Sequence, residues 1–268
     1  MNRIEKAFAN LKNKKAFIPY LLAGDPNLDI SEKLLHTYAE AGADLIEIGI
    51  PFSEPVADGP VIQKAHIRAL KNHVSLHDIF KLVKNFRKSN QNTPIILMTY
   101  VNPIEIFGYN QFVLEAKQSG VDGVLIVDLP PEEGKEFYIQ LKEETISPIF
   151  LITQTTPENR KDFILKQAHG FIYYVSLKGV TGSKIKDIEF VNKSIAHLKE
   201  KTKIPIAVGF GITDAKTAKK MSKSADAIII ATTLVEMIEH FEKKNDSKYL
   251  PELLDNINAF IKEINQAL

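Results

Sequence analysis

The chain contains no cysteine, so it can form neither a disulfide framework nor a thiolate metal site, and this composition fits a reducing compartment. It also lacks an excess of either charge. Its 34 basic and 33 acidic residues give a net charge of +1, which provides no general attraction to nucleic acid. No apolar run approaches the length of a membrane span, and the first residues contain no apolar signal core. We therefore expect a cytoplasmic protein that binds neither nucleic acid nor membrane.

The chain does contain a regular alternation of two kinds of segment. Short apolar runs typical of strands recur along it, and each is followed by a helical pattern. Most of these runs lack strict polar–apolar alternation, as expected for parallel strands that are covered on both faces. The expected strands are residues 16–23, 44–50, 94–100, 123–128, 148–153, 171–176, 205–209 and 226–232.

Helices are expected between these strands and at both ends of the chain. A short amphipathic helix at the start places Ile4, Phe8 and Leu11 on one face. The other expected helices are residues 31–40, 61–71 continuing through 76–88, 109–118, 132–143, 157–167, 188–199, 213–221, 234–243 and 251–266.

Eight strand–helix units in 268 residues indicate an α/β fold, the closed (β/α)8 or TIM barrel, because such barrels typically have about 250 residues. No linker or low-complexity segment interrupts the chain. We therefore expect one domain over residues 1–268, with an extra N-terminal helix and extra helices in the loops that follow the strands. A doubly wound open sheet is the alternative, and it is disfavoured because no GxGxxG motif follows the first strand.

The second expected strand carries an acidic residue, Glu47, among apolar neighbours. Strand side chains alternate between faces, so Glu47 shares its face with Leu45 and Gly49. A buried carboxylate without a partner is costly, and burial raises its pKa. The local sequence offers no cation to pair with it. We therefore expect Glu47 to act as an acid or a base.

A second carboxylate, Asp58, lies in the Pro/Gly-rich loop that follows the same strand. The active site of a TIM barrel lies at the carboxyl ends of the strands, so both carboxylates can reach the barrel mouth. Two carboxyl groups in different environments can have well-separated pKa values, so that one donates a proton while the other remains ionised. The alternative for Asp58-Gly59-Pro60 is a turn that caps the following helix, and the sequence alone leaves this alternative open.

Glycine and threonine gather in three later loops, at residues 178–183, 209–213 and 231–233. Glycine lets backbone N–H groups approach an anion, and a helix N-terminus adds its dipole. TIM barrels frequently bind phosphate with the loops after strands seven and eight. We therefore expect a phosphate site made of backbone groups, with Thr213 as the N-cap of the next helix. Each glycine taken alone could equally serve only a turn.

Three further side chains allow a structural interpretation beside a functional one. Tyr173 and Tyr174 are adjacent in the sixth strand, so one of them must face the interior. An inward tyrosine could pack on an aromatic substrate or hold a carboxylate, or could simply fill the core. Asp128 ends the fourth strand, and we expect it to cap the helix near residue 132 or to steady a loop. The seven histidines show no ligand spacing, so no metal site is expected.

The longest motif also resembles that of a known family. Residues 47–63 read EIGIPFSEPVADGPVIQ, which is similar to the signature of the tryptophan synthase alpha subunit. Shorter motifs of that family appear in its order, and the resemblance covers essentially the whole chain. These motifs are Gly24-Asp25-Pro26, Tyr100-x-Asn102-Pro103, Asp128-Leu129-Pro130, Gly179-Val180-Thr181-Gly182 and Gly209-Phe210-Gly211-Ile212.

The resemblance implies a lyase of tryptophan biosynthesis that cleaves indole-3-glycerol phosphate to indole and glyceraldehyde 3-phosphate. It maps the family's catalytic glutamate onto Glu47 and its catalytic aspartate onto Asp58. It also implies an alpha2beta2 heterotetramer, in which this chain has no cofactor and indole passes to a tryptophan synthase beta subunit that carries pyridoxal phosphate. The substrate-binding residues that it implies are Tyr20, Tyr100, Leu125, Tyr173, Thr181, Gly182, Phe210, Gly211, Ala231 and Thr232.

The chain departs from the family pattern at three places. Glu54 stands where aspartate is usual, at a position that the family uses against the beta subunit. Ala231-Thr232 replaces the common Gly-Ser of the phosphate loop, and Tyr20 stands where phenylalanine is usual in the indole pocket. The two carboxylates are intact, so these departures concern affinity and the interface rather than the reaction.

The residues 177–187 form a long, polar loop with glycines, and we expect it to be mobile and to bring Thr181 over Asp58 when it closes. Two other functions remain as alternatives. One is another phosphate-binding barrel lyase or isomerase that acts without a partner, and the other is a non-catalytic subunit that only activates a beta partner. The presence of both Glu47 and Asp58 argues against the second.

Overall fold

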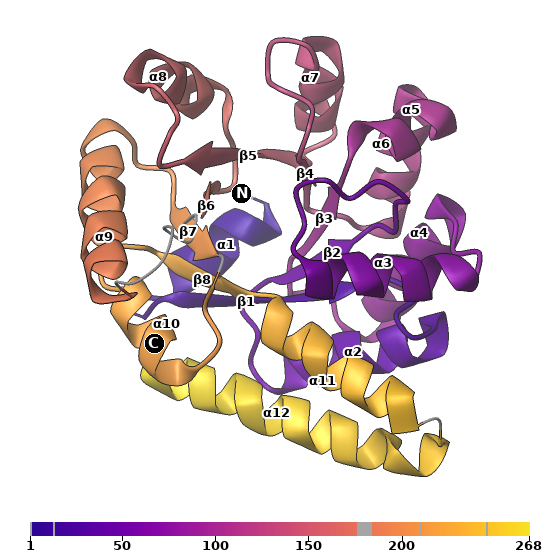
Figure 1. Cartoon of the computed structure of the whole chain (residues 1–268). Coiled ribbons are helices and arrows are strands. Elements are labelled where there is room, and N and C mark those ends of the chain that lie inside the picture. The colour runs from indigo at the N-terminus through magenta and orange to yellow at the C-terminus, as the bar shows by residue number, and fades with distance from the viewer. Residues whose placement is uncertain (1, 13, 176–183, 210, 245) are drawn as a thin grey trace.

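A closed barrel forms the centre of the molecule. The computed structural model describes residues 2–12, 14–175, 184–209, 211–244 and 246–268. Within these ranges eight parallel strands pair in sequence order, and β1 pairs with both β2 and β8 (Figure 1). This closure confirms the (β/α)8 fold and excludes the open sheet. The strands are β1 (Ala16–Leu22), β2 (Ile46–Gly49), β3 (Ile95–Thr99), β4 (Gly123–Ile126), β5 (Ser147–Thr153), β6 (Ile172–Val175), β7 (Ile206–Gly209) and β8 (Ala227–Ile230).

Helices surround the barrel and return the chain from one strand to the next (Figure 1). None of the described helices is long and apolar enough to cross a membrane. The helices are α1 (Arg3–Asn10), α2 (Leu28–Glu40), α3 (Pro60–Lys71), α4 (Leu76–Ser89), α5 (Val101–Phe107), α6 (Tyr109–Ser119), α7 (Lys135–Glu143), α8 (Glu158–Gln167), α9 (Lys184–Lys201), α10 (Ala215–Met221), α11 (Thr232–Lys244), the 3-10 helix η1 (Ser247–Tyr249) and α12 (Leu250–Ala267).

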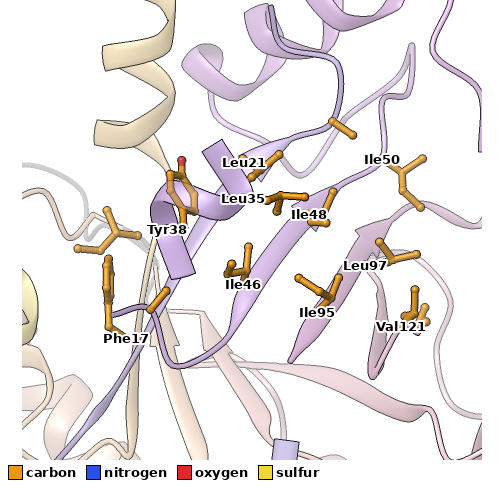
Figure 2. Packing of buried hydrophobic residues seen from close by; sticks show 14 of the residues in the cluster. Phe17, Leu21, Leu35, Tyr38, Ile46, Ile48, Ile50, Ile95, Leu97 and Val121 are labelled. Atoms are coloured by element: carbon orange, nitrogen blue, oxygen red, sulfur yellow. The ribbon is translucent and has the colours of Figure 1, made fainter. Parts of the chain in front are cut away.

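The strands bury apolar side chains on both of their faces. One face points into the barrel, where Ile18 and Ile96 belong to the inner apolar cluster. The other face packs under the surrounding helices, where Ile46 and Ile48 belong to the same cluster as Leu35 of α2 (Figure 2). Burial on both faces is the reason that the strands appear in the sequence as continuous apolar runs.

The N-terminal helix α1 closes one end of the barrel. Ile4 and Phe8 pack against the inner apolar cluster, and the ring of Phe8 lies 6.1 Å from the ring of Phe171. Asn2 donates from Nδ2 to Oγ of Ser147, 2.8 Å away at the start of β5. Helix α1 therefore covers the amino ends of the strands, and the carboxyl ends remain open for a site.

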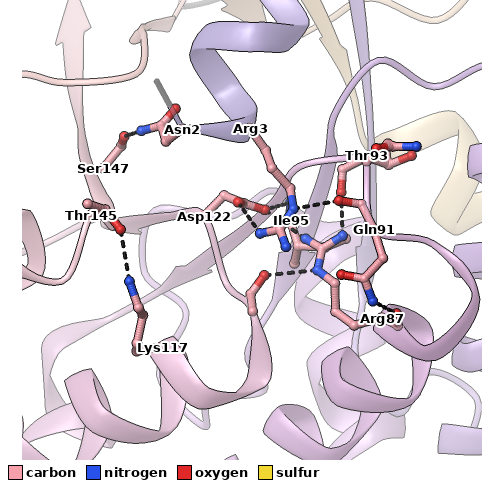
Figure 3. Close-up of polar contacts among 12 residues, drawn as sticks. Asn2, Arg3, Arg87, Gln91, Thr93, Ile95, Lys117, Asp122, Thr145 and Ser147 are labelled. Atoms are coloured by element: carbon pink, nitrogen blue, oxygen red, sulfur yellow. Dashed lines mark hydrogen bonds and ion pairs between the residues drawn. The ribbon is translucent and has the colours of Figure 1, made fainter.

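A buried ion network fixes the same end of the barrel (Figure 3). Both oxygens of Asp122 are occupied: Arg87 lies 2.7 Å from Oδ2, and Arg3 of α1 lies 2.9 Å from Oδ1. The N–H of Ile95 donates to Oδ2 at 2.9 Å. Arg87 also donates to three backbone carbonyls. Burial lowers the pKa of Arg87 to about 10, so this guanidinium stays charged at neutral pH and pairs with Asp122.

The sequence located the strands to within one or two residues at each described end, but one expected helix is wrong. Residues 61–88 form two helices, because α3 ends at Lys71 with Asn72 as its C-cap, and His73 adopts a left-handed conformation with φ of 53°. A new helix then starts at Ser75, whose side chain forms a capping box with Asp78. This Ser-x-x-Asp signature was present in the sequence and marks a helix start.

Two short elements were not predicted, and one helix begins late. Helix α5 starts directly after Tyr100 and carries Pro103 in its first turn, where a missing N–H costs no hydrogen bond. The 3-10 helix η1 precedes α12. Helix α7 begins at Lys135 rather than near residue 132, because Gly134 is its N-cap.

The ion network predicts a stability effect at Arg87. Arg87→Ala leaves the buried Asp122 carboxylate with one cation fewer and three carbonyls without their donor. The free energy of unfolding, measured by urea denaturation, should fall by about 3–5 kcal/mol. Lys88→Ala changes the exposed neighbour on the same helix and should stay within about 0.5 kcal/mol of the wild type. Equal losses in the two variants would contradict the role given to the network.

Candidate active site

Glu47 lies on β2 with its side chain inside the barrel, near the open end. It is 1% exposed, and within the described part of the chain its Oε1 has no hydrogen-bond partner. Burial, with a smaller contribution from the charge of Asp58, raises the pKa of Glu47 to about 8. The side chain is therefore protonated at neutral pH and can donate a proton.

Two tyrosines reach into the same space because two strand positions are glycines. A Cβ atom at Gly49 would lie 2.0 Å from the hydroxyl oxygen of Tyr20, and one at Gly209 would lie 2.4 Å from that of Tyr173. Any larger residue at either position would displace a tyrosine ring. Burial raises the pKa of both Tyr20 and Tyr173, and the charges of Asp58 and Glu47 add to this effect, so both hydroxyls remain protonated.

Asp58 lies in the loop after β2, at the mouth of the barrel. Its side chain is 12% exposed, so it is shielded from bulk solvent but can be reached from the mouth. The hydroxyl of Tyr100 donates to Asp58 Oδ2 at 2.8 Å, and His66 Nε2 lies 3.3 Å from the same oxygen. The carboxylate is therefore held from one side by two ring systems.

The same two rings also hold the backbone of this loop. The N–H of Phe52 donates to His66 Nδ1 at 3.0 Å, and the N–H of Ala57 donates to the hydroxyl oxygen of Tyr100 at 3.0 Å. The rings of Phe52 and Tyr100 lie 5.3 Å apart. Sequence reasoning missed His66. The available signal was its place on the buried face of α3 with Ile62, the helix that starts directly after Asp58-Gly59.

No metal site accompanies these residues in the described ranges: no three His, Asp or Glu side chains there are grouped so as to hold an ion. Asp128 has a structural contact, since its Oδ1 accepts from the N–H of Val101 at 2.8 Å. This contact steadies the start of α5, and Asp128 does not cap the helix after its own strand. Asp128 can reach α5 because β3 and β4 are neighbours, so the loops at their carboxyl ends lie together. Tyr174 is buried on the outer face of β6 while Tyr173 faces inward.

The loops after β7 and β8 lie together at the same end of the barrel. Thr233 Oγ1 donates to the carbonyl oxygen of Thr213 at 3.3 Å, which joins the two loops. Gly211 has a φ of 76°, a left-handed conformation that favours glycine. Thr232 is the first residue of α11, so the N–H groups of that first turn, which have no acceptor within the helix itself, lie at this rim.

The expectation that Thr213 caps the next helix is wrong. Asp214 is the N-cap of α10, and its side chain accepts from the N–H of Thr217 at 2.8 Å. This backbone hydrogen bond is the main reason that the pKa of Asp214 is lowered. Aspartate is a stronger N-cap than threonine, so where both are adjacent the helix starts at the aspartate.

Comparison with known proteins assigns the chain to a family. The family model described as tryptophan synthase alpha chain matches residues 7–265. The chain belongs to the tryptophan synthase alpha chain family. The tryptophan synthase alpha chain of Nitrosomonas europaea is 48% identical over 270 residues, which cover 100% of this chain and 96% of that protein. The family predicted from the sequence motifs is therefore confirmed.

Solved structures agree with this assignment. The crystal structure of tryptophan synthase subunit alpha from Legionella pneumophila matches with a TM-score of 0.89 at 38% identity, over 100% of this chain and 98% of that one. A chain of the tryptophan synthase complex from Pyrococcus furiosus matches with a TM-score of 0.81 at 36% identity, over 94% of this chain and 98% of that one. Tryptophan synthase alpha chains are lyases that cleave indole-3-glycerol phosphate.

The residues that the alpha-chain resemblance implied as substrate contacts fall into two groups. Among those that the structure describes, Leu125 is fully buried in the inner cluster, and Ala231 packs against the cluster that contains Tyr20. Thr181, Gly182 and Phe210 lie outside the described residues. Most of the expected mobile loop, residues 177–183 of 177–187, also lies outside them.

The raised pKa of Glu47 predicts a pH dependence of stability. Between about 4.5 and about 8 the folded state binds a proton that the unfolded state has lost, so the stabilisation decreases as the pH rises through this window. Glu47→Gln removes this effect. The free energy of unfolding of Glu47→Gln should therefore exceed that of the wild type, and the difference should grow as the pH rises from about 4.5 to about 8. It should reach several kcal/mol at the alkaline end, because each unit of pKa shift corresponds to about 1.4 kcal/mol.

Urea denaturation at a series of pH values measures this difference. Glu143→Gln is the control, because Glu143 is an exposed acid at the end of α7 and its replacement should leave the pH slope of the wild type unchanged. If the free energies of unfolding of Glu47→Gln and the wild type change with pH in parallel, the pKa of Glu47 is not raised by folding.

Proposed function

We propose that Glu47 and Asp58 are the catalytic residues with which this chain cleaves indole-3-glycerol phosphate to indole and glyceraldehyde 3-phosphate. The observation that carries the proposal is the pairing of two unlike carboxyl groups at one end of the barrel. Glu47 is buried and holds its proton to a pH of about 8, while Asp58 accepts a hydrogen bond from Tyr100 at the mouth. Two carboxyl groups separated in this way can serve as acid and as anion.

Glu47 acts first as an acid and then as a base. Its carboxyl group donates a proton to C3 of the indole ring, which makes the ring cationic and weakens the bond from C3 to the glycerol side chain. The resulting carboxylate takes the proton of the adjacent glycerol hydroxyl as that carbon–carbon bond breaks. The electron pair of the broken bond returns to the ring, the hydroxyl carbon becomes an aldehyde, and Glu47 is protonated again. No redox partner is needed.

Asp58 stabilises the charge that this step creates. The indole nitrogen becomes positive when C3 is protonated, and a carboxylate that accepts the indole N–H is most favourable at that moment. Because Oδ2 already accepts from Tyr100, the substrate N–H is proposed to bind at Oδ1. An interaction that strengthens in the transition state raises kcat rather than only lowering KM.

The phosphate group is proposed to bind between Gly182, Gly211 and the start of α11 at Thr232. The N-terminal turn of α11 supports this site, since its first backbone N–H groups have no partners within the helix. The N-terminus of α10 is less suitable, because the carboxylate of Asp214 already caps it. Binding at the phosphate end positions the reacting end near Glu47.

The beta subunit is proposed to dock beside the loop that carries Asp58. Tryptophan synthase alpha chains act with a beta subunit, and pyridoxal phosphate belongs to that subunit. Two large apolar side chains are exposed on or beside this loop: Val56 is 79% exposed within it, and Ile106, 84% exposed on α5, lines the same surface pocket as Pro51 at the start of the loop. Exposed apolar side chains on adjacent elements are typical of a protein interface. We further propose a cytoplasmic location, which suits a biosynthetic enzyme of this family.

The catalytic proposal predicts a loss of activity in two variants. Glu47→Gln cannot donate and accept the proton, so indole release should fall by at least about 10²–10⁴-fold, the range of a general acid–base group. Asp58→Asn should also be severely impaired, because a neutral amide cannot stabilise the cation. In the wild type, kcat/KM should decrease as the pH rises through about 8, when Glu47 loses its proton. Indole release by Glu47→Gln at the wild-type rate would refute the assignment.

The docking proposal predicts a binding defect without an intrinsic catalytic defect. Ile106→Asp places a charge in an apolar interface and should weaken binding of the cognate beta subunit about tenfold or more by calorimetry. Ile139→Asp is the matched control, since Ile139 is an exposed isoleucine on α7 that is not part of this surface. Indole release by either variant alone should match the wild type. If both variants bind the beta subunit equally well, the docking surface lies elsewhere.

A further inference from the structure

We propose that His66 is a positioning residue for Asp58. In its neutral form it ties the backbone of the loop after β2 to the Asp58 carboxylate and, together with Tyr100, directs Oδ1 of Asp58 toward the substrate. This inference rests on the proposed function, because it assigns a role within the same reaction. His66 is 4% exposed as a side chain, so its ring is enclosed by the protein rather than free in solvent.

The backbone of the loop decides which nitrogen of His66 carries the proton. The N–H of Phe52 can only donate, and it points at His66 Nδ1 from 3.0 Å. Nδ1 must therefore be the unprotonated, accepting nitrogen of a neutral ring. The proton is then on Nε2, which lies 3.3 Å from Asp58 Oδ2. The contact thus presents a donor to the carboxylate, and contacts of this kind in ligand-free sites often shorten when substrate binds.

Tyr100 has the same two-sided arrangement on the other end of the loop. Its hydroxyl oxygen accepts the N–H of Ala57 and donates its proton to Asp58 Oδ2. Both rings therefore connect a backbone N–H of the loop to the same carboxylate oxygen. Because His66 and Tyr100 both approach Oδ2, the other oxygen is left for a further donor, and the orientation of the carboxylate is set before the substrate arrives.

The arrangement also couples Asp58 to the shape of its loop. Phe52 and Ala57 lie near the two ends of the segment, and a displacement of either N–H would move the ring that it contacts. A movement of that ring changes the direction in which Asp58 Oδ1 points. His66 thus acts through Asp58 and touches neither substrate nor reacting atoms.

Two substitutions separate the two contacts of His66. The amide of an asparagine reaches only the Nδ1 position, so His66→Asn can keep the acceptor for Phe52 but loses the donor to Asp58. The amide of a glutamine reaches the Nε2 position, so His66→Gln can keep the donor and loses the acceptor. Gln63→Ala is the matched control, because Gln63 on the same helix donates to the backbone carbonyl of Asp58 and not to its carboxylate.

Steady-state kinetics of indole release test the proposal. In His66→Asn, kcat should fall about tenfold or more with KM changed by less than about threefold, because the lost contact of Nε2 with the charged Asp58 carboxylate acts mainly in the transition state. His66→Gln should recover most of kcat, and Gln63→Ala should stay within about threefold of the wild type. A purely structural role of His66 would instead lower the melting temperature in both histidine variants and leave kcat of the folded fraction unchanged, which would overturn the proposal. Equal losses of kcat in His66→Asn and Gln63→Ala would also overturn it.

A second measurement does not depend on turnover. The ¹⁵N shifts of the imidazole ring, assigned by comparison of wild type with His66→Asn, should show a protonated Nε2 and an unprotonated Nδ1 at neutral pH. The opposite tautomer or a doubly protonated ring would contradict the proposal. A wild-type chain that releases no indole would instead refute the proposed function, while a wild-type chain with normal turnover and an active His66→Asn variant would refute only the role of His66.

Discussion

The burial of one carboxyl group without a charged partner is the constraint on which the rest of the site depends. Glu47 is enclosed by the barrel, and its Oε1 has no hydrogen-bond partner in the described part of the molecule. Such a group can persist only as the neutral acid, which is the form that a proton donor needs. The barrel makes this possible because β2 is held on both edges by parallel neighbours, so the strand cannot rotate Glu47 into solvent.

The two ends of the barrel differ in how completely their buried polar groups are paired. At the amino end, Asp122 has a partner for each oxygen, and the network joins α1, α4 and β3. At the carboxyl end, Glu47 Oε1 has no hydrogen-bond partner among the residues that the structure describes, and Asp58 has one oxygen held by Tyr100. Fully paired polar groups add rigidity, whereas incompletely paired ones retain a capacity to bind substrate. Stability and reactivity are thus separated along the barrel axis, as is usual in this fold.

Local sequence patterns predicted the features that short stretches of the chain determine by themselves, such as the strands and the buried acid. The strands were found because burial on both faces produces continuous apolar runs, and Glu47 was conspicuous as an acid within one of them. Helix α5 was missed because Pro103 is read as a turn signal although it is also favourable in a first helical turn. The break at His73 was missed because a left-handed histidine has no local signature. His66 was missed for a different reason: its contact with Phe52 exists only after α3 has folded back over its loop.

The way α1 closes the barrel has a consequence for synthesis on the ribosome. This helix leaves the ribosome before the strands of the barrel, yet Arg3 contacts a residue 119 positions later and Asn2 contacts one 145 positions later. More than half of the chain must therefore exist before the first helix can find its binding place. Until then, the apolar side of α1, with Ile4 and Phe8, has no partner from the barrel interior. A growing chain of this kind exposes that surface for about 7–30 seconds, since synthesis adds about 5–20 residues per second, and the surface can bind a chaperone that acts on nascent chains.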